Sequence, residues 1–437
     1  MSRFRLLIAF VSLVVPILEA TAAPPAPGIY KVEPTADIQK LLNHLKERDR
    51  PFEAIKALAA RDDAAPYLRL ELQTAVDIRY KKYLTEAIAN LEAKGLLKGY
   101  ERNKTRYATW AENGRLDMCA ELLVVCPDKD DAAKLISLTM PVRKKVVAGL
   151  GEAVGPHDDR KFWGPMPNLP FTYEHESGGD LTLDPHWGRG WPAIVRADRC
   201  TVQVFCKANW FVAARSYLRD QLPPHQTVGE WLHSVVLVND STRLPRVTES
   251  LIVCDGDIDL VPGLDFSVII ANGSIRSKEG GAGRKTYLCA TEDIVMARSK
   301  TLGNNIFHAG RTVTFAEKLK PSDRVREKQK TLPFGIQFLD PEEFGVVLAA
   351  QNGGVQVMEI AANSPFAKYG VEDGDIITAI DGVSATTLPI FRRQLRRGVI
   401  AESVVLNIRR GKTPTTRIVF LDGIPVPTAP MPREATK

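Results

Sequence analysis

Two stretches of this sequence bring together side-chain types that hydrolases use. The first is His175-Glu176-Ser177-Gly178-Gly179, where a serine stands two residues after a histidine and opens a glycine-rich turn. Nucleophilic catalysis needs a base within hydrogen-bond reach of the serine and a further group that orients the base. No glycine stands two residues before Ser177, and no second histidine follows His175 by four residues as a zinc-protease helix requires. The stretch is predicted to be a glycine-rich turn, with a hydrolase site around Ser177 as the alternative.

The second stretch is Asp255-Gly256-Asp257-Ile258-Asp259, which places carboxylates at alternate positions. Alternate residues of a strand share one face, so Asp257 and Asp259 are expected to point outward together. Such a row can hold calcium, as a glycan lyase would require, but solvated side chains on a strand give the same pattern. No cysteine pair has the Cys-x-x-Cys spacing of zinc and redox sites. We expect no catalytic residue, no metal site and no cofactor, with a hydrolase or glycan lyase as the alternative.

Length and composition are those of a globular protein with two to four domains. Of the 437 residues, 44% are hydrophobic and 25% are charged, which are ordinary values for a chain that folds. The net charge of +6 is small, and basic residues alternate with acidic ones along most of the chain. A nucleic-acid-binding protein concentrates positive charge on one face, so no nucleic-acid partner is expected.

The first residues have the form of a secretory signal peptide. Arg3 and Arg5 precede an apolar run over residues 6–18, and the small residues 20–22 follow as a cleavage site. The run is shorter than the roughly 20 residues that a membrane-spanning helix needs. We expect residues 1–22 to be removed, which leaves no stable membrane span and places the protein in the periplasm or another extracytoplasmic space. An uncleaved anchor is the alternative.

The cysteines form an even set in a chain that is expected to be exported. They are Cys119, Cys126, Cys200, Cys206, Cys254 and Cys289. Such a set permits disulfides without requiring them. Buried free thiols are the simpler expectation, because a free cysteine packs as a small apolar side chain.

A repeat runs through the middle of the chain, in segments that begin at Ser234, Ser250, Ser267, Thr286 and Asn305. Each segment has an apolar residue in one column and an inward-facing residue, apolar in all but the first segment, after a corner. The columns are Val236, Ile252, Ile269, Leu288 and Phe307, then Thr242, Ile258, Ile275, Ile294 and Val313. Inward residues at alternate positions on both sides of a corner, recurring every 16 to 19 residues, describe the coil of a parallel β-solenoid. The repeat resembles the parallel β-helices of polysaccharide-active enzymes and bacterial scaffold filaments, a likeness of architecture that does not fix activity.

The C-terminal part begins with Phe334-Gly335-Ile336-Gln337-Phe338, an apolar-glycine-apolar run that is expected to lead into a strand. Further strands and turns are indicated by Gly354–Ile360, Asn363-Ser364-Pro365, Gly374-Asp375 and Ile380-Asp381-Gly382. A helix over Leu388–Arg397 places Phe391 and Leu395 four residues apart on one face.

Together these motifs resemble a PDZ domain over residues 332–422, in the arrangement of bacterial proteases of the high-temperature-requirement type, although no protease domain precedes it. The resemblance implies that an extended peptide or a protein C-terminus adds as a strand between the edge at Ile336–Phe338 and the helix with Phe391 and Leu395. Main-chain donors around Gly335 would cap its carboxylate. Ile336 and Phe338 would line the groove and Gln337 would point away. Core packing is the alternative for Phe391 and Leu395.

The same helix is unusually basic, with Arg392-Arg393 and Arg396-Arg397. A solvated helix face is the simpler expectation for these arginines. Attraction to an acidic peptide or partner surface is the alternative, and it would make Arg392 part of the peptide site.

The fold class is therefore multidomain α+β, with an N-terminal α-helical domain, a central parallel β-solenoid and a C-terminal PDZ-like domain. Its expected function is that of an exported, non-enzymatic scaffold or adaptor that binds peptides. The expected parts are a signal peptide (1–22), a linker (23–34), the helical domain (35–150), a mixed segment of short strands and loops (151–233), the solenoid (234–316), a linker (317–331), the PDZ-like domain (332–422) and a disordered tail (423–437).

Overall fold

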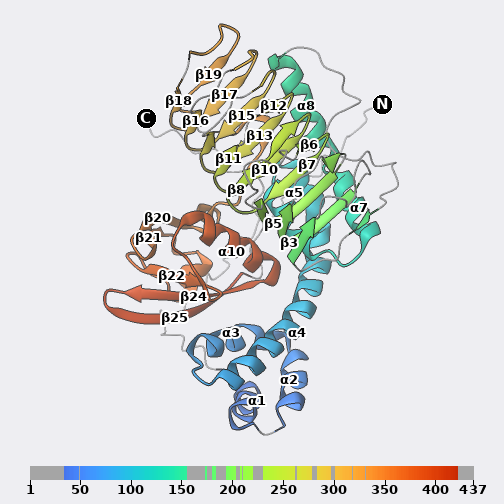
Figure 1. Cartoon of the computed structure of the whole chain (residues 1–437). Coiled ribbons are helices and arrows are strands. Elements are labelled where there is room, and N and C mark those ends of the chain that lie inside the picture. Colours follow the sequence, from blue (N-terminus) through green and yellow to red (C-terminus); the bar gives the residue numbers. More distant parts are fainter. Residues whose placement is uncertain are drawn as a thin grey trace, which may run out of the picture.

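The computed structural model describes residues 34–48, 50–154, 173–174, 180–183, 193–202, 207–208, 210–219, 230–260, 263–277, 283–296, 301–316, 318–329 and 331–421. Within these ranges it has helices at the N-terminal end, a stack of parallel strands in the middle and a separate C-terminal sheet (Figure 1). The predicted signal peptide, the linker up to residue 33, the tail and the stretch around Ser177 lie outside the described residues.

The N-terminal helices form two groups joined by the long helix α4. Thr35 and Asp77 cap α1 and α4, because their side-chain oxygens accept hydrogen bonds from Ile38 N and Tyr80 N. The first group, α1 to the start of α4, has its own apolar core, and the second packs on the parallel strands. The helices are α1 (Ala36–Glu47), α2 (Pro51–Ala59), α3 (Ala65–Thr74), α4 (Ile78–Asn103), α5 (Tyr107–Glu112), α6 (Leu116–Val125), α7 (Lys129–Leu138) and α8 (Met140–Val154).

The described residues of the middle part form three parallel sheets, and the predicted β-solenoid is confirmed. The first sheet has the order β1-β3-β5-β7-β10-β13-β15-β17-β19, with β2 beside β3. Its strands are β1 (Tyr173–Glu174), β2 (Asp180–Leu183), β3 (Ala193–Val202), β5 (Trp210–Arg219), β7 (Val235–Val238), β10 (Leu251–Cys254), β13 (Val268–Ala271), β15 (Tyr287–Ala290), β17 (Ile306–Ala309) and β19 (Arg324–Arg326).

The other two sheets are formed by the strands that follow the first-sheet strand along each coil. The second consists of β8 (Thr242–Leu244), β11 (Ile258–Leu260), β14 (Ile275–Ser277), β16 (Ile294–Met296) and β18 (Val313–Phe315). The third consists of β4 (Lys207–Ala208), β6 (Glu230–Leu232), β9 (Arg246–Thr248) and β12 (Leu264–Asp265).

The register of the coils follows the two predicted columns. Ile252 pairs with Val236 and Ile269, and the ladder continues through Leu288 to Phe307. Polar side chains cross-link the coils at their starts, since Ser250 Oγ accepts from Ser234 N at 2.9 Å and Ser267 Oγ from Ser250 N at 3.2 Å. The parallel ladder extends beyond the repeat to β3 and β5, which lie within the segment 151–233.

Both faces of the first sheet are buried at β7, β10 and β13, which explains why these strands are apolar at every position. The side chains at one set of alternate positions fill the solenoid interior, and Val235, Leu237 and Leu251 of the other set pack against the helical layer. Helix α6 lies against β3, β5 and β7. A sheet covered on both sides has no solvent face to alternate with, so runs such as Val-Val-Leu-Val and Val-Ile-Ile-Ala result.

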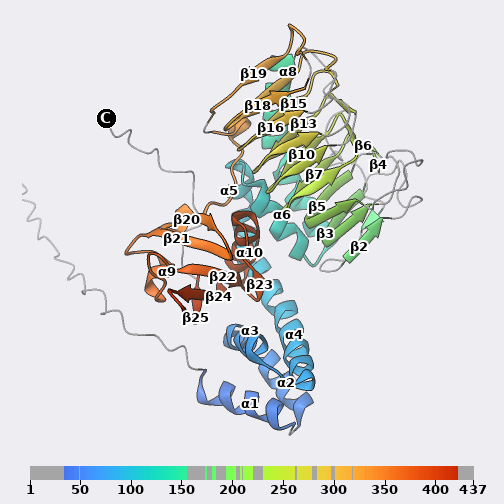
Figure 2. The same ribbon diagram turned by 60° about the vertical axis from the view of Figure 1, so that its left-hand side comes forward.

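The C-terminal sheet is antiparallel, in the order β20-β21-β22-β24-β25 with β23 beside β22. Helix α10 lies between this sheet and the helical layer, where it contacts α4 and α6 (Figure 2). One hydrophobic cluster runs from α5–α8 across the outer face of the solenoid into this unit. Its elements are β20 (Val346–Gln351), β21 (Gly354–Ile360), α9 (Pro365–Lys368), β22 (Ile376–Ile380), β23 (Val383–Ser384), α10 (Leu388–Ala401), β24 (Ser403–Arg410) and β25 (Thr413–Phe420).

No helix among the described residues combines the length and the apolar character that crossing a bilayer requires. The described cysteines are all buried, and Cys119, Cys126, Cys254 and Cys289 are free thiols, as expected. Cys206 lies outside the described residues.

The central coil provides a test of the stacked core. Ile269 is fully buried between Ile252 and Leu288, so Ile269→Ala is expected to lower the free energy of unfolding by about 2–5 kcal/mol through lost contacts and a cavity. Thr314→Ala, at an exposed position of β18, should change it by no more than about 0.5 kcal/mol. Denaturant unfolding of both variants measures the difference, and equal values would contradict the inward placement of Ile269.

Candidate peptide-binding site

The predicted glycine-hinged strand at residues 334–338 is not formed. Phe334 belongs to the 3₁₀ turn η4 (Pro333–Gly335) and has a φ of 64°. Its ring meets Tyr287 of β15 edge-on, with centroids 5.0 Å apart, and lies so close to α8 that a Cβ on Gly149 would be 2.5 Å from it. Phe334 therefore joins α8 to the solenoid and is not placed as a groove residue.

The main-chain donors that follow are engaged within the chain. Ile336 N donates to Pro333 O at 3.3 Å, Gln337 N to Gly114 O at 3.1 Å and Leu339 N to Asp117 Oδ2 at 2.7 Å. Ile336 is buried, and Gln337 and Phe338 are half-buried. The local pattern predicts a strand, but these donors are taken by η4, by the loop before α6 and by α6 itself.

A second apolar-glycine-apolar motif, Phe344-Gly345-Val346, lies ten residues later and leads directly into β20. Sequence reasoning missed it, although a signal was present. Asn352-Gly353 stands between two runs of strand-forming residues, which is a strong indication of a hairpin. The structure forms that hairpin, with β20 and β21 paired from Val346↔Ile360 to Gln351↔Gly354.

Strand β20 is an edge of the C-terminal sheet, at the opposite end of the strand order from β25. No strand among the described residues pairs with the side of β20 that faces away from β21. Val357 directs its N–H to Asp375 O and its C=O to Gly374 N, both at 2.8 Å, so it makes no hydrogen bond with Leu348 opposite. In an antiparallel pair this leaves the N–H and C=O of Leu348 pointing to the open side.

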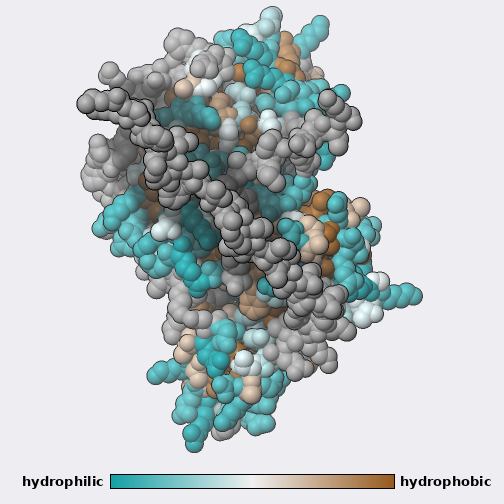
Figure 3. All heavy atoms as spheres, turned by 180° about the vertical axis from the view of Figure 1, so that it is seen from behind, coloured by the Kyte–Doolittle hydropathy of each residue, from teal (hydrophilic) through white to brown (hydrophobic). Residues whose placement is uncertain are grey.

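Helix α10 lies beside this edge and contacts β20. Phe391 and Leu395 are fully buried in the hydrophobic cluster, whereas Leu348 and Leu388 are half-buried against it. Seen from behind, hydrophobic surface gathers where β20 and β21 lie, and Met358 of β21 is 54% exposed (Figure 3). The edge thus combines free main-chain groups with an apolar surround.

Three of the four arginines of α10, namely Arg392, Arg393 and Arg396, are bound to the solenoid, which corrects the expected solvated face for these residues. Arg392 Nη2 lies 3.2 Å from Asp255 Oδ1 and donates to Asn272 O at 3.3 Å. Arg396 forms an ion pair with the same Asp255 and donates to Asn239 O at 3.2 Å. Arg393 pairs with Asp240. The acidic partner surface is the protein's own, at the corners between β7 and β8 and between β10 and β11.

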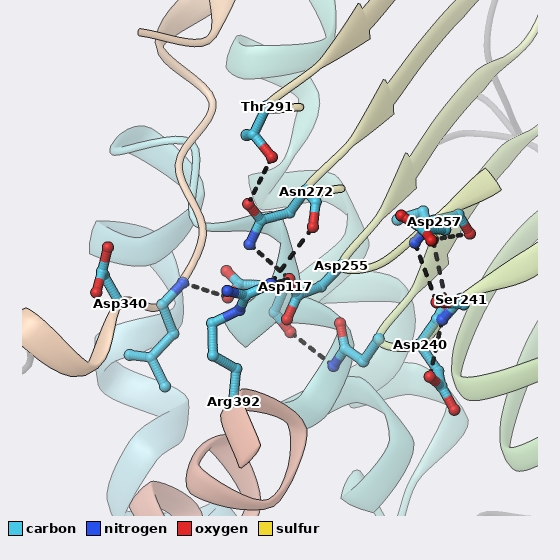
Figure 4. A network of polar contacts seen from close by, with 12 residues as sticks. Asp117, Asp240, Ser241, Asp255, Asp257, Asn272, Thr291, Asp340 and Arg392 are labelled. Atoms are coloured by element: carbon cyan, nitrogen blue, oxygen red, sulfur yellow. Dashed lines mark hydrogen bonds and ion pairs between the residues drawn. The ribbon is translucent and has the colours of Figure 1, made fainter. Parts of the chain in front are cut away.

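Further hydrogen bonds, made by two asparagines, complete this network (Figure 4). Asn272 Nδ2 donates to Asp255 Oδ1 at 2.6 Å, and Asn239 Nδ2 donates to Asp117 O of α6 at 3.1 Å. Burial by itself would raise the pKa of Asp255, but the charges of Arg392 and Arg396 outweigh it and hold that pKa below its ordinary value. The carboxylate is therefore ionised and fully compensated.

Further contacts fix the C-terminal unit to the helices. Arg115 binds Glu343 through both Nη atoms, at 2.7 to 2.9 Å, and Arg69 Nη1 lies 3.2 Å from Asp381 Oδ1. A Cβ on Gly99 of α4 would be 2.3 Å from Ile400 O, so only glycine permits this approach of α4 and α10. The candidate site is held on a rigid support.

The residues considered for chemistry have other roles where they are described. Asp257 Oδ1 accepts from Ser274 N and Asp257 Oδ2 from Arg276 Nη1, both at 2.7 Å. Among the described residues no three metal-ligating side chains come together. His175 and Ser177 lie outside the described residues, so the structure does not test them.

Two aspartates two residues apart give a matched test of the network. Asp255→Asn removes the counter-charge of Arg392 and leaves buried Arg396 only its longer ion pair with Asp117, at 3.7 Å, so it should cost about 3–5 kcal/mol of unfolding free energy. Asp257→Asn removes a partly exposed pair with Arg276 and should cost no more than about 1 kcal/mol. Denaturant unfolding distinguishes the two, and equal losses would contradict the structural role of Asp255.

The same network sets a pH dependence. Because the folded-state pKa of Asp255 is depressed, its stabilisation is present above the unfolded-state value of about 3.9 and is lost as pH falls through the folded-state pKa. The wild-type protein should lose stability more steeply below about pH 4 than Asp255→Asn does. Unfolding free energies would be measured for both proteins between pH 2 and pH 6. If they fell equally steeply with pH, the result would contradict this prediction.

The comparisons with known proteins agree with the fold of this unit. Residues 335–419 match the model of the PDZ domain family. A comparison with curated proteins finds no match for the chain. The finer resemblance to the high-temperature-requirement type has no support from either comparison and stays a prediction. Residues 335–419 form a PDZ domain, a module whose presence points to the binding of peptides or proteins.

Proposed function

We propose that this protein is an exported, non-enzymatic scaffold or adaptor whose PDZ domain binds extended peptides or C-termini of other proteins by strand addition. The observation that carries the proposal is the open edge of β20, where the N–H and C=O of Leu348 point away from the sheet beside α10. A peptide strand laid along this edge would form main-chain hydrogen bonds with β20. The binding edge is thus β20, ten residues beyond the segment that the first motif indicated.

The surroundings of β20 support recognition of apolar side chains. Leu348 and Leu388 are only half-buried, and Met358 of the neighbouring strand β21 is exposed. Alternate side chains of an added strand point toward and away from the helix, so one set would contact Leu348 and Leu388. Of the predicted helix residues, Phe391 and Leu395 support this surface from below, and Arg392 anchors α10 to the solenoid.

The rigid support of α10 fits a binding role. A peptide site whose helix moved freely would have to order that helix on binding, at a cost in affinity. Here Asp255 and Asp240 of the solenoid fix α10 through Arg392, Arg393 and Arg396. The solenoid and the helices act as the scaffold that presents the PDZ domain.

The proposed location is the periplasm or another extracytoplasmic space. It is supported by the pattern of residues 1–22, in which Arg3 and Arg5 precede an apolar run and a small-residue cleavage site. Immunoblotting of cell fractions tests this, with the expected result a cleaved chain outside the cytoplasm. A full-length cytoplasmic chain would contradict it.

Strand addition along β20 predicts a loss of binding when an edge donor is removed. Random peptides of about twelve residues, displayed both internally and at free C-termini, would be selected on the full chain and measured by fluorescence anisotropy. Leu348→Pro should weaken selected peptides by at least about tenfold, because it removes an outward N–H that β21 does not use. Val347→Thr, on the same strand with its donor intact, should bind like the wild type.

A ligand-side measurement keeps the test independent of folding. N-methylation of successive peptide residues should abolish binding at every second position, because only alternate N–H groups face β20. Tolerance of N-methylation at all positions, or binders indifferent to Leu348→Pro, would refute strand addition at this edge.

A further inference from the structure

We propose that the β20 edge binds internal extended segments of a partner polypeptide, and that a free C-terminal carboxylate contributes nothing to recognition. This inference rests on the proposed strand addition and names its ligand class. Three observations support it: the N–H groups around the glycine are engaged, acidic side chains stand before β20, and the residues at both ends of β20 are exposed.

The glycine that precedes β20 has no N–H to offer. Gly345, with a φ of 70°, ends the 3₁₀ turn η5 (Pro341–Phe344), and its N–H donates to Glu342 O at 2.9 Å. The carbonyls beside it are also bound, since Gly345 O accepts from Ala361 N and Phe344 O from Ser364 Oγ. A carboxylate needs a concave group of free N–H donors, and this loop is folded as the end of a helical turn instead.

The earlier glycine motif does not supply such a site either. A Cβ on Gly114 would lie 2.1 Å from Gly335 O, so the two backbones are in direct contact. The next donors, Ile336 N and Gln337 N, bind Pro333 O and Gly114 O. The N–H of the second glycine and the two donors that follow the first glycine are therefore engaged within the chain.

Charge at the start of β20 also opposes a terminal carboxylate. Asp340 and Glu343 stand just before the strand, and Asp340 is exposed. Arg115 offsets Glu343 but uses both terminal nitrogens to do so and has a side chain only 2% exposed. An incoming carboxylate would meet like charge, whereas the uncharged amide of a continuing chain would not.

The two ends of the edge are open to a chain that continues. At the start of β20 the side chains of Asp340, Glu342 and Val347 are exposed. At its end Gln351 is exposed, and a Cβ on Gly353 would have open space around it. A segment can therefore enter at one end of β20 and leave at the other.

The test compares three forms of each peptide selected on the full chain, namely the free acid, the C-terminal amide and the same sequence with glycine-serine extensions at both ends. Affinities of the three forms should agree within about threefold, because no contact depends on the terminus. Internal display should also yield binders that Leu348→Pro weakens. The Val347→Thr variant serves as the control for nonspecific effects.

A loss of about tenfold or more on amidation or extension would overturn this inference, as would binders obtained only from the free C-terminal library. Failure of the proposed function has a different signature, because the selected peptides would then ignore both Leu348→Pro and N-methylation. If binding depends on the β20 edge but requires a free acid, strand addition holds and only the ligand class is wrong.

Discussion

A fully buried carboxylate, Asp255, determines how the parts of this molecule are arranged. An ionised group without solvent contact is tolerated only when its charge and its hydrogen-bonding capacity are both satisfied. Here Arg392 and Arg396 provide the charge and Asn272 provides a hydrogen bond. Because the two arginines stand four residues apart on α10, they fix both the position and the rotation of that helix. The spacing between α10 and the β20 edge depends on this placement.

The solenoid contributes a largely apolar sheet face as well as these acidic corners. The outer side of its first sheet shares one hydrophobic cluster with α6, α8 and the PDZ domain. Helix α6 is central to this arrangement, since its Asp117 accepts from Leu339 N and its Glu121 binds Arg215 of β5 at 2.5 Å. The helical layer therefore joins the solenoid to the PDZ domain through both apolar packing and buried polar contacts.

The parts that could be predicted from the sequence are those set by local periodicity. Stacking of Ile252 on Val236 and Ile269 follows from the spacing of the coils, because each coil repeats the same inward positions. The strand at Ile336–Phe338 could not be excluded in this way. Two motifs, Phe334-Gly335-Ile336 and Phe344-Gly345-Val346, are locally equivalent, and only pairing with β21 distinguishes the one that leads into a strand. The ion pair of Arg396 with Asp255 could not be predicted either. A basic helix face has the same sequence pattern whether it is solvated or paired with an aspartate far away in the chain.

The contacts that fix α10 also impose an order on how the chain matures. Arg396 follows its partner Asp255 by 141 residues, and Glu343 follows Arg115 by 228. Loop closure over such separations is slow, and the early partners are made long before the late ones. Until the last hundred or so residues have been synthesised, Asp255 lacks its arginine partners on α10. The part of the hydrophobic cluster that the PDZ domain covers is exposed in the same period. Docking of the PDZ domain on the helices and the solenoid is thus a late step of folding. A chain that ends before α10 would keep this apolar surface exposed and would be prone to aggregation.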